Sequence, residues 1–407
     1  MKNKKYHLFE VVGVELEYML VDNENLSVIP EVDALLTDKN GSLTSDIDNG
    51  EISWSNELVA HVVELKTNGP TADHERLSMF FLENIREINR ILKPKGQRLL
   101  PTASHPFMNP KKETVLWKHN YNEVYSLYNK IFDCSGHGWS NVQSMHLNFP
   151  FYNDEEFEML HAAIRILLPI IPALTASSPI FEGKVTGYKD SRLAVYKNNQ
   201  KEIPQLTGKV IPERIFTKKD YEKIIFEPIK KAIKPYDAEG ILDRHFLNSR
   251  GAIARFDRNA IEIRIIDIQE CPKVDLAIAD FLIKVLQHLT NFGELEKQKS
   301  WHENDLFKIF DEVIKTGEKT KLQGEYLTLF DLPQTEILVR DLWMSLFKEI
   351  SNTMSFENQE IISIILERGC LSSRIISALD RDFSAKNIHK VYHDLADCLD
   401  KNKLFIP

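Results

Sequence analysis

The sequence has little cysteine and lacks any long apolar segment. Its four cysteines, at positions 134, 271, 370 and 398, lie far apart and form no CxxC pair. Such spacing excludes a disulfide scaffold and indicates free thiols in a reducing compartment. No stretch approaches the roughly 18 uncharged apolar residues of a membrane span, and no apolar run follows the basic N-terminus as in a signal peptide. We therefore expect a cytoplasmic protein without membrane contact.

The sequence also has fewer basic than acidic residues. The 51 Lys and Arg residues against 60 Asp and Glu residues leave a net charge of -9. An acidic balance argues against nucleic acid or an anionic membrane as the main partner, and small-molecule substrates are expected instead. Familiar motifs are missing as well, because the sequence has no P-loop, dinucleotide fingerprint, GxSxG, HExxH or protein-kinase set. The chemistry is therefore expected to depend on polar groups within otherwise buried strands.

The 407 residues are enough for two or three domains, or for one large domain with an appendage. Alternating apolar residues predict strands over 11–21, 57–67, 141–149 and 260–267, with a turn-rich segment at 38–42 between the first two. Helical spacing predicts helices over 73–92, 154–168 and 274–289, a loop over 176–192, and further helices over most of 300–401. The prediction is an α+β fold, with a mixed catalytic part at 1–295 and a helical C-terminal region at 296–407.

Two carboxylates, Glu15 and Glu17, share one face of the first predicted strand. Residues two apart on a strand lie about 7 Å from one another, so burying both without a counter-charge would be costly. A divalent cation offsets this repulsion, and oxygen ligands suit Mg²⁺ or Mn²⁺. The alternative is the solvated face of an edge strand, and this pair alone does not decide between the two.

Glu57 and Glu64 flank the second predicted strand with opposite parity. Both can face one site if a bulge intervenes, or if Glu57 precedes the strand itself. Glu64 is the stronger metal candidate because it lies within the apolar segment Val62-Val-Glu-Leu. An ion pair with Lys66 on the same face is the alternative for Glu64.

Polar residues also occupy one face of each later strand. His146 lies between Ser144 and Asn148, and Glu262 shares its face with Arg264. A lone strand histidine is more often structural, and a Glu and Arg on one face are often an ion pair. The functional alternative is a set of metal ligands beside a guanidinium that stabilises transferring phosphate.

Arg250 and Arg255 lie just upstream of the last strand and add positive charge there. Together, the strands would line one carboxylate-rich face with arginines at its rim. Phosphoryl transfer needs both components, because metals bridge the nucleotide phosphates and cations hold the developing charge. Spacing and composition define this chemistry no further.

Six short motifs occur along the chain: Gly13-Val-Glu-Leu-Glu, Val63-Glu-Leu-Lys-Thr, Met145-His-Leu-Asn-Phe, Thr175-Ala-Ser-Ser-Pro-Ile-Phe-Glu-Gly-Lys-Val-Thr-Gly-Tyr, Ser191-Arg and Ala260-Ile-Glu-Ile-Arg-Ile-Ile-Asp. In this order they resemble the glutamate–cysteine ligase type 2 family, whose members are also called carboxylate-amine ligases. Each motif alone is weak evidence for this family, whereas all six in this order are specific for it. The resemblance covers roughly residues 8–290 and fades over about 200–245, where it places no substrate contact.

The resemblance implies a glutamine synthetase-like fold, in which a curved, largely antiparallel sheet flanked by helices holds metals and nucleotide on its concave face. It also implies an ATP-dependent ligase that activates the γ-carboxylate of glutamate as an acyl phosphate, which an amine then attacks. Cysteine is the first acceptor expected, and another amine or amino acid is the alternative. ATP and Mg²⁺ or Mn²⁺ are the implied cofactors.

The motif match further implies roles for single residues. The implied metal ligands are Glu15, Glu17, Glu57, Glu64, His146 and Glu262. Asn148 and Arg192 would contact substrate, and Arg264 would stabilise the phosphate. Of the neighbouring cations, we expect Arg255 to assist in catalysis and Arg250 to contact substrate.

Other functions stay open at this stage. A metal-dependent hydrolase would use the same carboxylates without ATP, but it would usually bring more histidines and would not need Arg264 beside Glu262. A phosphagen-type kinase would depend more on an arginine cluster, and a silent binding protein would not need every motif acid. The helical C-terminal region would cover the back of the sheet, form a subunit interface in a homo-oligomer, or accept a partner.

Overall fold

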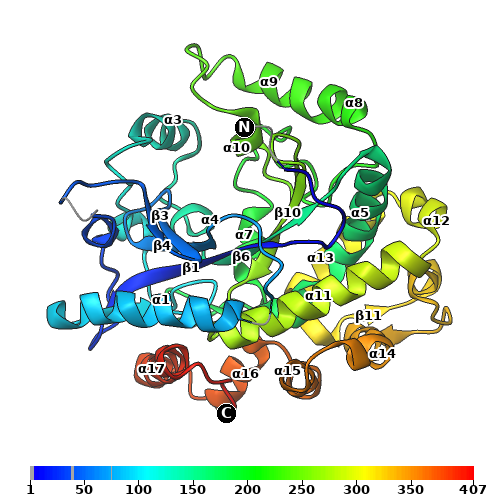
Figure 1. Ribbon diagram of the computed structural model, residues 1–407. Coiled ribbons are helices and arrows are strands. Elements are labelled where there is room, and N and C mark those ends of the chain that lie inside the picture. The colour runs from blue at the N-terminus through cyan, green and yellow to red at the C-terminus, as the bar shows by residue number, and fades with distance from the viewer. Residues whose placement is uncertain (1–3, 38–40, 75) are drawn as a thin grey trace.

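The computed structural model describes residues 4–37, 41–74 and 76–407 (Figure 1). An eight-stranded sheet forms its centre, in the order β2-β3-β4-β1-β6-β10-β9, and β5 pairs with the second half of β1. Every ladder among the described residues of this sheet is antiparallel. The strands are β1 (Gly13–Asp22), β2 (Asp46–Asn49), β3 (Ile52–Asn56), β4 (Val62–Thr67), β5 (Gln97–Leu100), β6 (Ser144–Pro150), β9 (Ala252–Arg255) and β10 (Ala260–Asp267). The predicted α+β fold with a largely antiparallel sheet is confirmed.

Side-chain alternation in β1 gives the sheet one apolar and one acidic face. Val14, Leu16 and Tyr18 are fully buried in the hydrophobic core. Glu15 and Glu17 alternate with them and therefore lie on the opposite face. Because β1 pairs with β4 on one side and with β5 and β6 on the other, it is an internal strand. The alternative of a solvated edge strand is thus wrong for this pair of acids.

Strand register gathers the polar residues into one patch. Glu17 lies directly opposite Glu64 in the β1–β4 ladder, and Glu15 lies opposite His146 in the β1–β6 ladder. Glu262 of β10 lies opposite the next residue on that face of β6, Asn148. Since directly opposed residues project from the same face, four strands deliver their polar side chains to a single surface.

Three long helices cover the apolar face of the sheet. Figure 1 shows α1 (Leu77–Leu92) and α11 (Pro272–Phe292) beneath it, with α5 (Asp154–Leu167) at one side. Each helix buries an apolar stripe, such as Phe81, Ile85 and Ile88 in α1 or Val274, Ile278 and Phe281 in α11. This spacing of three and four residues is typical of an amphipathic helix and explains why these segments fold as predicted.

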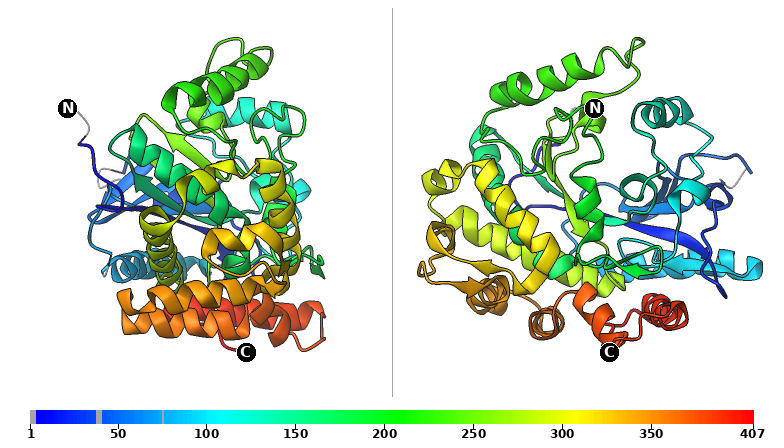
Figure 2. Two further views of the ribbon diagram at one scale, coloured as in Figure 1. Left: turned by 90° about the vertical axis from the view of Figure 1, so that its right-hand side faces the viewer. Right: turned by 180° about the vertical axis from the view of Figure 1, so that it is seen from behind.

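The C-terminal region consists of α12 (Leu295–Ser300), α13 (Glu303–Thr316), α14 (Val339–Ile350), α15 (Phe356–Arg368), α16 (Leu371–Ala378) and α17 (Ala385–Lys401). Helices α14 to α17 form a further layer below α1 and α11 (Figure 2), whereas α12 packs against α5, and α13 packs against α6 (Pro172–Thr175) and α7 (Ser191–Tyr196). The predicted helical character is confirmed, apart from a small hairpin of β11 (Lys321–Leu322) and β12 (Ile337–Leu338). One hydrophobic cluster extends from Val14 in β1 to Leu399 in α17. The division at residue 295 stays a prediction.

Shorter elements lie on the side of the sheet that carries the acids, above it in Figure 1. They are α3 (Asn122–Phe132), α4 (His137–Ser140), α7 (Ser191–Tyr196), α8 (Lys218–Tyr221), α9 (Glu227–Ile233) and α10 (Arg244–Leu247). The remaining short elements are α2 (Pro110–Glu113), α6 (Pro172–Thr175), β7 (Ile180–Phe181) and β8 (Lys184–Val185). No helix in the described ranges is long and apolar enough to cross a membrane.

Two sequence predictions of secondary structure were right only in part. The strand predicted over 57–67 begins at Val62, and Glu57 instead follows β3 in the loop before β4. The predicted loop over 176–192 contains the β7–β8 hairpin and the start of α7. In both segments short elements are joined by tight connections, so the alternation is too brief to locate their ends. Residues 38–40 of the predicted turn-rich segment lie outside the described residues.

Candidate active site

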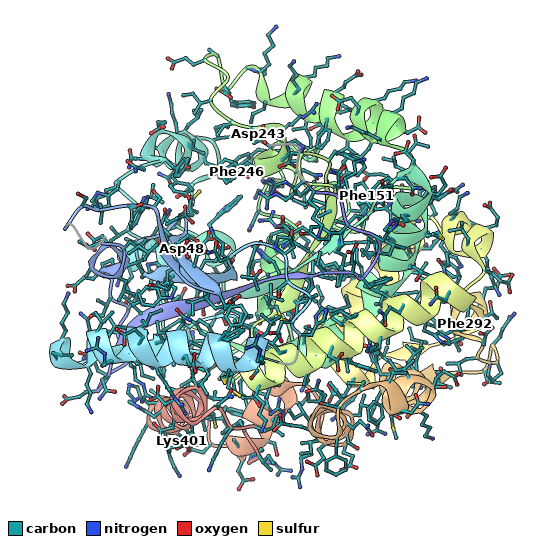
Figure 3. The ribbon with its side chains drawn as sticks, in the orientation of Figure 1. Asp48, Phe151, Asp243, Phe246, Phe292 and Lys401 are labelled. Atoms are coloured by element: carbon teal, nitrogen blue, oxygen red, sulfur yellow. The ribbon has the colours of Figure 1, made fainter. Side chains whose placement is uncertain are left out.

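The acidic face of the sheet forms the floor of a cleft. This large cleft has a volume of about 960 Å³, at the upper end of the usual range for ligand sites. A smaller inner cavity of about 150 Å³ adjoins it. Both are lined by Glu17, Glu57, His146, Phe246 and Arg264, so the polar patch lies between them. In Figure 3, Phe246 and Asp48 are labelled as two residues that line the large cleft.

Two groups of possible metal ligands share His146. Glu15, His146 and Glu262 form one group, and Glu17, Glu64 and His146 form the other. Within each group, one ligand atom from every residue lies within 4.8 Å of the others. Glu57 lines the same cleft from the loop after β3, as expected if it precedes the strand. The structure therefore brings all six predicted metal ligands to one place.

Protein donors fix one oxygen of each of two carboxylates. Glu17 Oε2 accepts hydrogen bonds from the backbone N–H and the hydroxyl of Ser144, at 2.7 and 2.9 Å. Glu64 Oε2 accepts from the hydroxyl of Ser55 at 2.6 Å and lies 3.1 Å from the ammonium of Lys66. The predicted ion pair between Glu64 and Lys66 is thus present within the cleft. It does not exclude a metal role, because Glu64 also belongs to one of the two groups of possible ligands.

The acids of the cleft carry more negative charge than their surroundings neutralise. Burial raises the pKa of Glu64 to about 7, with a further contribution from the charge of Glu15. Burial, together with the charges of Glu17 and Glu64, raises the pKa of Glu57 well above its ordinary value. Glu57 and Glu64 are therefore costly to ionise beside the other acids. A bound cation would remove this cost.

His146 is the centre of the patch. Burial alone lowers its pKa, but the hydrogen bond to Glu15 and the charge of Glu17 outweigh that effect and raise the pKa to about 9. For Glu15, burial opposes ionisation, and the hydrogen bond and charge of His146 nevertheless lower its pKa. His146 Nδ1 lies 3.0 Å from Glu15 Oε2, and Nε2 lies 3.0 Å from the Ser144 hydroxyl. At neutral pH a proton on His146 supplies part of the missing positive charge.

These observations fit divalent cations bound by oxygen ligands. The donor set is five carboxylates and a single histidine, which suits Mg²⁺ or Mn²⁺ better than zinc. The raised pKa values of Glu57 and Glu64 indicate an unmet demand for positive charge. Asn148 donates to Glu15 Oε1 at 3.0 Å, while its own carbonyl oxygen is buried without a hydrogen-bond partner among the described residues.

Arginines line the cleft beside Glu262. Arg264 Nε lies 2.9 Å from Glu262 Oε1, and Arg255 Nη1 lies 3.5 Å from Glu262 Oε2. The β10–β6 register shifts between Ile263 and Ile266, so Arg264 occupies a bulge. A bulge can redirect a side chain, and Arg264 lines both the large cleft and the inner cavity.

The two remaining predicted arginines lie in different surroundings. Arg192 is buried, ion-paired with Asp267 and part of the wall of the inner cavity. Arg250 is buried in a pairing with Glu213, at 2.6 Å for both Nε and Nη2, and it also donates to backbone carbonyls. Arg250 lines neither the large cleft nor the inner cavity, so the structure does not bring it to the other site residues.

Several residues at the site had no signal in the sequence. Tyr128, Trp139 and Tyr196 line the inner cavity from short helices, and an aromatic residue in a helix usually indicates core packing. Asp267 ends a motif strand but is fully buried behind Arg192. Only the three-dimensional contacts distinguish these residues from the hydrophobic core.

Comparison with known proteins places this site in a family. Residues 11–385 match the family described as Glutamate-cysteine ligase family 2 (GCS2). The chain belongs to this family. The matched residues include the sheet and most of the helical C-terminal region. As a member of this family, the chain is an ATP-dependent ligase of the carboxylate–amine class.

Two relatives illustrate the range of similarity. An uncharacterised protein of Archaeoglobus fulgidus is 31% identical over 402 residues, covering 97% of this chain and all of that protein. A protein of Bradyrhizobium sp. (strain ORS 278), provisionally named glutamate–cysteine ligase 2, is 28% identical over 228 residues. That alignment covers 55% of this chain and 50% of the relative.

Two solved structures share the fold at low sequence identity. A bifunctional glutathione synthetase from Pasteurella multocida aligns with a TM-score of 0.65 and 14% identity, covering 97% of this chain and 53% of that one. A glutamate–cysteine ligase from Francisella tularensis, in complex with AMP, aligns with a TM-score of 0.58 and 16% identity. The alignment covers 98% of this chain and 90% of the Francisella chain. The likeness spans the sheet and the helical layers alike.

Proposed function

We propose that this chain joins the γ-carboxylate of glutamate to an amine, with ATP as the energy source and cysteine as the first acceptor to test. In the first step a γ-carboxylate oxygen attacks the terminal phosphorus of ATP, and ADP leaves. In the second step the amine nitrogen attacks the acyl carbon, and phosphate leaves with that carboxylate oxygen. The amine loses a proton, and the products are a γ-glutamyl amide, ADP and phosphate.

One observation carries this proposal: the five predicted carboxylate ligands, one histidine and three arginines line a single cleft large enough for a nucleotide. ATP and a carboxylate are both anions and would repel one another without such counter-charges. Mg²⁺ or Mn²⁺, when bound by the acids, would supply charge to the phosphates. Family membership and the nucleotide in the Francisella protein support the use of ATP.

The chain's own residues have separate tasks in this mechanism. The acids of β1, β4 and β10, with Glu57 from the loop after β3 and His146 from β6, would hold the metals in the floor of the cleft. Arg264 lies between the large cleft and the inner cavity, where it would contact the phosphate as it passes to the carboxylate. Arg255 would add charge from the other side of Glu262. A planar guanidinium suits this role because it can hold two phosphate oxygens at once.

No described residue that lines the inner cavity is specific for a thiol. An acceptor other than cysteine is therefore the second candidate. The decisive test supplies ATP, Mg²⁺ and glutamate with each of a panel of amines, and measures phosphate release and the γ-glutamyl product. Cysteine supporting the fastest turnover is the expected result.

The acyl phosphate has a separate test. Glutamate labelled with heavy oxygen in its γ-carboxylate should transfer one labelled oxygen to the released phosphate per turnover, with ADP as co-product. A hydrolase would place solvent oxygen in its product, and a kinase acting on a guanidine would transfer no carboxylate oxygen. Formation of AMP and pyrophosphate would indicate an adenylate instead and would contradict the proposed mechanism.

A further inference from the structure

The segment that precedes β1 adds a wall to the large cleft. We refer to residues 4–8 as the N-terminal strap, of which Lys4 and Tyr6 line the cleft. In Figure 1 this dark-blue segment lies above the sheet, on the side that carries the acids. The residues matched by the family begin at position 11, so they do not include the strap. Family membership therefore assigns no task to these residues.

One carboxylate holds the strap against helix α5. Glu156, in the first turn of α5, lies 2.6 Å from His7 Nδ1 through Oε1. Its Oε2 accepts hydrogen bonds from the backbone N–H of Leu8 at 3.0 Å and from that of Tyr152 at 2.9 Å. A single side chain thus ties the strap at two points to the segment where α5 begins.

Tyr152 provides a second attachment. The ring of His7 stacks on the ring of Tyr152, with centroids 4.3 Å apart, and Lys5 Nζ donates to the Tyr152 carbonyl at 3.2 Å. Alternate residues of the strap therefore divide into two sets. Lys5 and His7 contact Tyr152 outside the large cleft, whereas Lys4 and Tyr6 line it. Contacts on both sides of Tyr6 in the sequence thus determine where its ring lies.

The ammonium of Lys4 is a cation without an ionic partner. Its Nζ lies 4.5 Å from the centre of the Tyr6 ring, and it forms no ion pair with any carboxylate in the part of the chain that the structure describes. The other Lys and Arg residues that line the cleft each lie within ion-pair distance of at least one carboxylate: Lys66, Arg255, Arg258 and Arg264. An aromatic face attracts an ammonium but accepts no conventional hydrogen bond, so the N–H groups of Lys4 stay free for another acceptor.

A phosphate group is the acceptor that best suits this ammonium. Lysine binds phosphate as a compact point charge, and the large cleft has room for a nucleotide, which the inner cavity lacks. A triphosphate keeps negative charge even with one Mg²⁺ bound, so a cation on the wall adds to what the metals in the floor supply. Amino-acid substrates also carry carboxylates, and the tests must separate these two sources of negative charge.

We propose that the N-terminal strap forms part of the nucleotide site. Lys4 contacts the phosphates of Mg-ATP, Tyr6 orients the Lys4 ammonium, and Glu156 is the positioning residue for the strap. The inference rests on the proposed function, since it places ATP in the large cleft. It goes further by giving the nucleotide a contact from outside the residues that the family matches.

Calorimetric titration with Mg-ATP tests the contact. Lys4→Gln should weaken binding about fivefold at low salt, and this loss should shrink to less than about twofold near 0.5 M salt, because exposed charges are then screened. Lys5→Gln is the matched control. It removes the same charge from the adjacent exposed residue, which does not line the cleft, and should stay within about twofold of the wild type.

The source of the negative charge is tested by kinetics. Lys4→Gln should raise KM for ATP and leave both kcat and KM for the amino acid within about twofold. Tyr6→Leu should cause a partial loss of Mg-ATP affinity, and Tyr6→Phe should retain the affinity because it keeps the ring. In a chain that carries both Lys4→Gln and Tyr6→Leu, the loss should not exceed that of Lys4→Gln alone, since Tyr6 acts through Lys4.

Glu156 has its own variants. Glu156→Ala releases both attachments and should raise KM for ATP about as much as Lys4→Gln does, with kcat nearly unchanged. Glu156→Gln keeps one acceptor oxygen and should restore part of the affinity. Glu155→Ala, at an exposed acid in the same turn of α5, is the control and should behave like the wild type.

Three results would overturn the inference. The first is equal Mg-ATP affinity in Lys4→Gln and Lys5→Gln, which includes the absence of binding to the wild type. The second is a loss in Lys4→Gln that is the same at low and high salt, which would indicate a change of shape instead of charge. The third is a raised KM for the amino acid alone. Failure of the proposed function looks different, because the γ-glutamyl product would be missing while Mg-ATP binding still depends on Lys4.

Discussion

Glu15, Glu64 and Glu262 come from three different strands, yet each contributes to one of the two ligand groups around His146. We predict that Glu→Gln at any of these positions weakens Mg-ATP binding by about tenfold or more and preserves the fold. The carboxamide keeps the shape but brings no charge to a cation. Calorimetry with Mg-ATP and thermal melting measure the two effects. Glu318→Gln, a buried acid outside both cavities, is the control, and unchanged affinity in all three variants would contradict the metal assignment.

Arg264 differs from its neighbours because it lies on a bulge between the two cavities. We predict that Arg264→Lys lowers kcat about 100-fold, since lysine cannot hold two phosphate oxygens in one plane. The melting temperature should change by little. Arg258→Lys, at the exposed rim of the same cleft, should keep kcat within about threefold. If Arg264→Lys behaved like that control, Arg264 would be only the ion-pair partner of Glu262.

At the scale of single elements, helix α5 carries a histidine that stays neutral in the folded protein. Burial and the nearby charge of Arg165 lower the pKa of His161 to about 3, from an ordinary value of 6.5. Between these values the unfolded chain binds a proton that the folded chain does not, so stability falls as pH falls from 6.5 towards 3. The predicted loss is on the order of 5 kcal/mol.

Urea unfolding at several pH values measures this effect. In His161→Leu the free energy of unfolding should fall less over that pH range. Leucine binds no proton in the folded or the unfolded chain, so this position no longer makes stability depend on pH. His7→Gln is the control, since the side chain of His7 is 64% exposed. An unchanged pH dependence in His161→Leu would assign the acid sensitivity to other groups, of which buried His61 and His105, with pKa values lowered to about 4, are the first candidates.

The elements also explain which features the sequence could predict. Strands β1 and β10 alternate around their glutamates, at 12–18 and 261–265, so their faces follow from periodicity. The β2–β3 hairpin has strands of only four and five residues, so the alternation of Ile52, Ser53, Trp54 and Ser55 is too short to predict a strand. The motif acids were predictable because glutamate is unusual inside such strands. Asp267 was not, since its partners Ser177 and Arg192 lie 75 to 90 residues away.

At the scale of the whole molecule, the sheet and the helical C-terminal region share one hydrophobic cluster. Helix α11 packs between them, with Asp280 accepting a hydrogen bond from Asn358 of α15 at 2.8 Å. We predict that residues 1–295 alone do not fold cooperatively, because the outer face of α11 would be exposed. Near-ultraviolet circular dichroism and limited proteolysis of this fragment test the prediction. A cooperative, protease-resistant fragment would instead make 296–407 a separate extension.

The hydrogen bonds from Ser144 to Glu17 and from Ser55 to Glu64 have a consequence for ion selectivity. Each occupies one carboxylate oxygen, so each acid offers a cation one oxygen rather than two. Ca²⁺ commonly takes carboxylates in bidentate fashion with six to eight oxygens, whereas Mg²⁺ accepts single oxygens and retains water. We therefore expect a lower turnover rate with Ca²⁺ than with Mg²⁺. In Ser144→Ala the difference between these two rates should become smaller. The hydroxyl groups behind the acids, more than the acids themselves, would then set which metal this ligase can use.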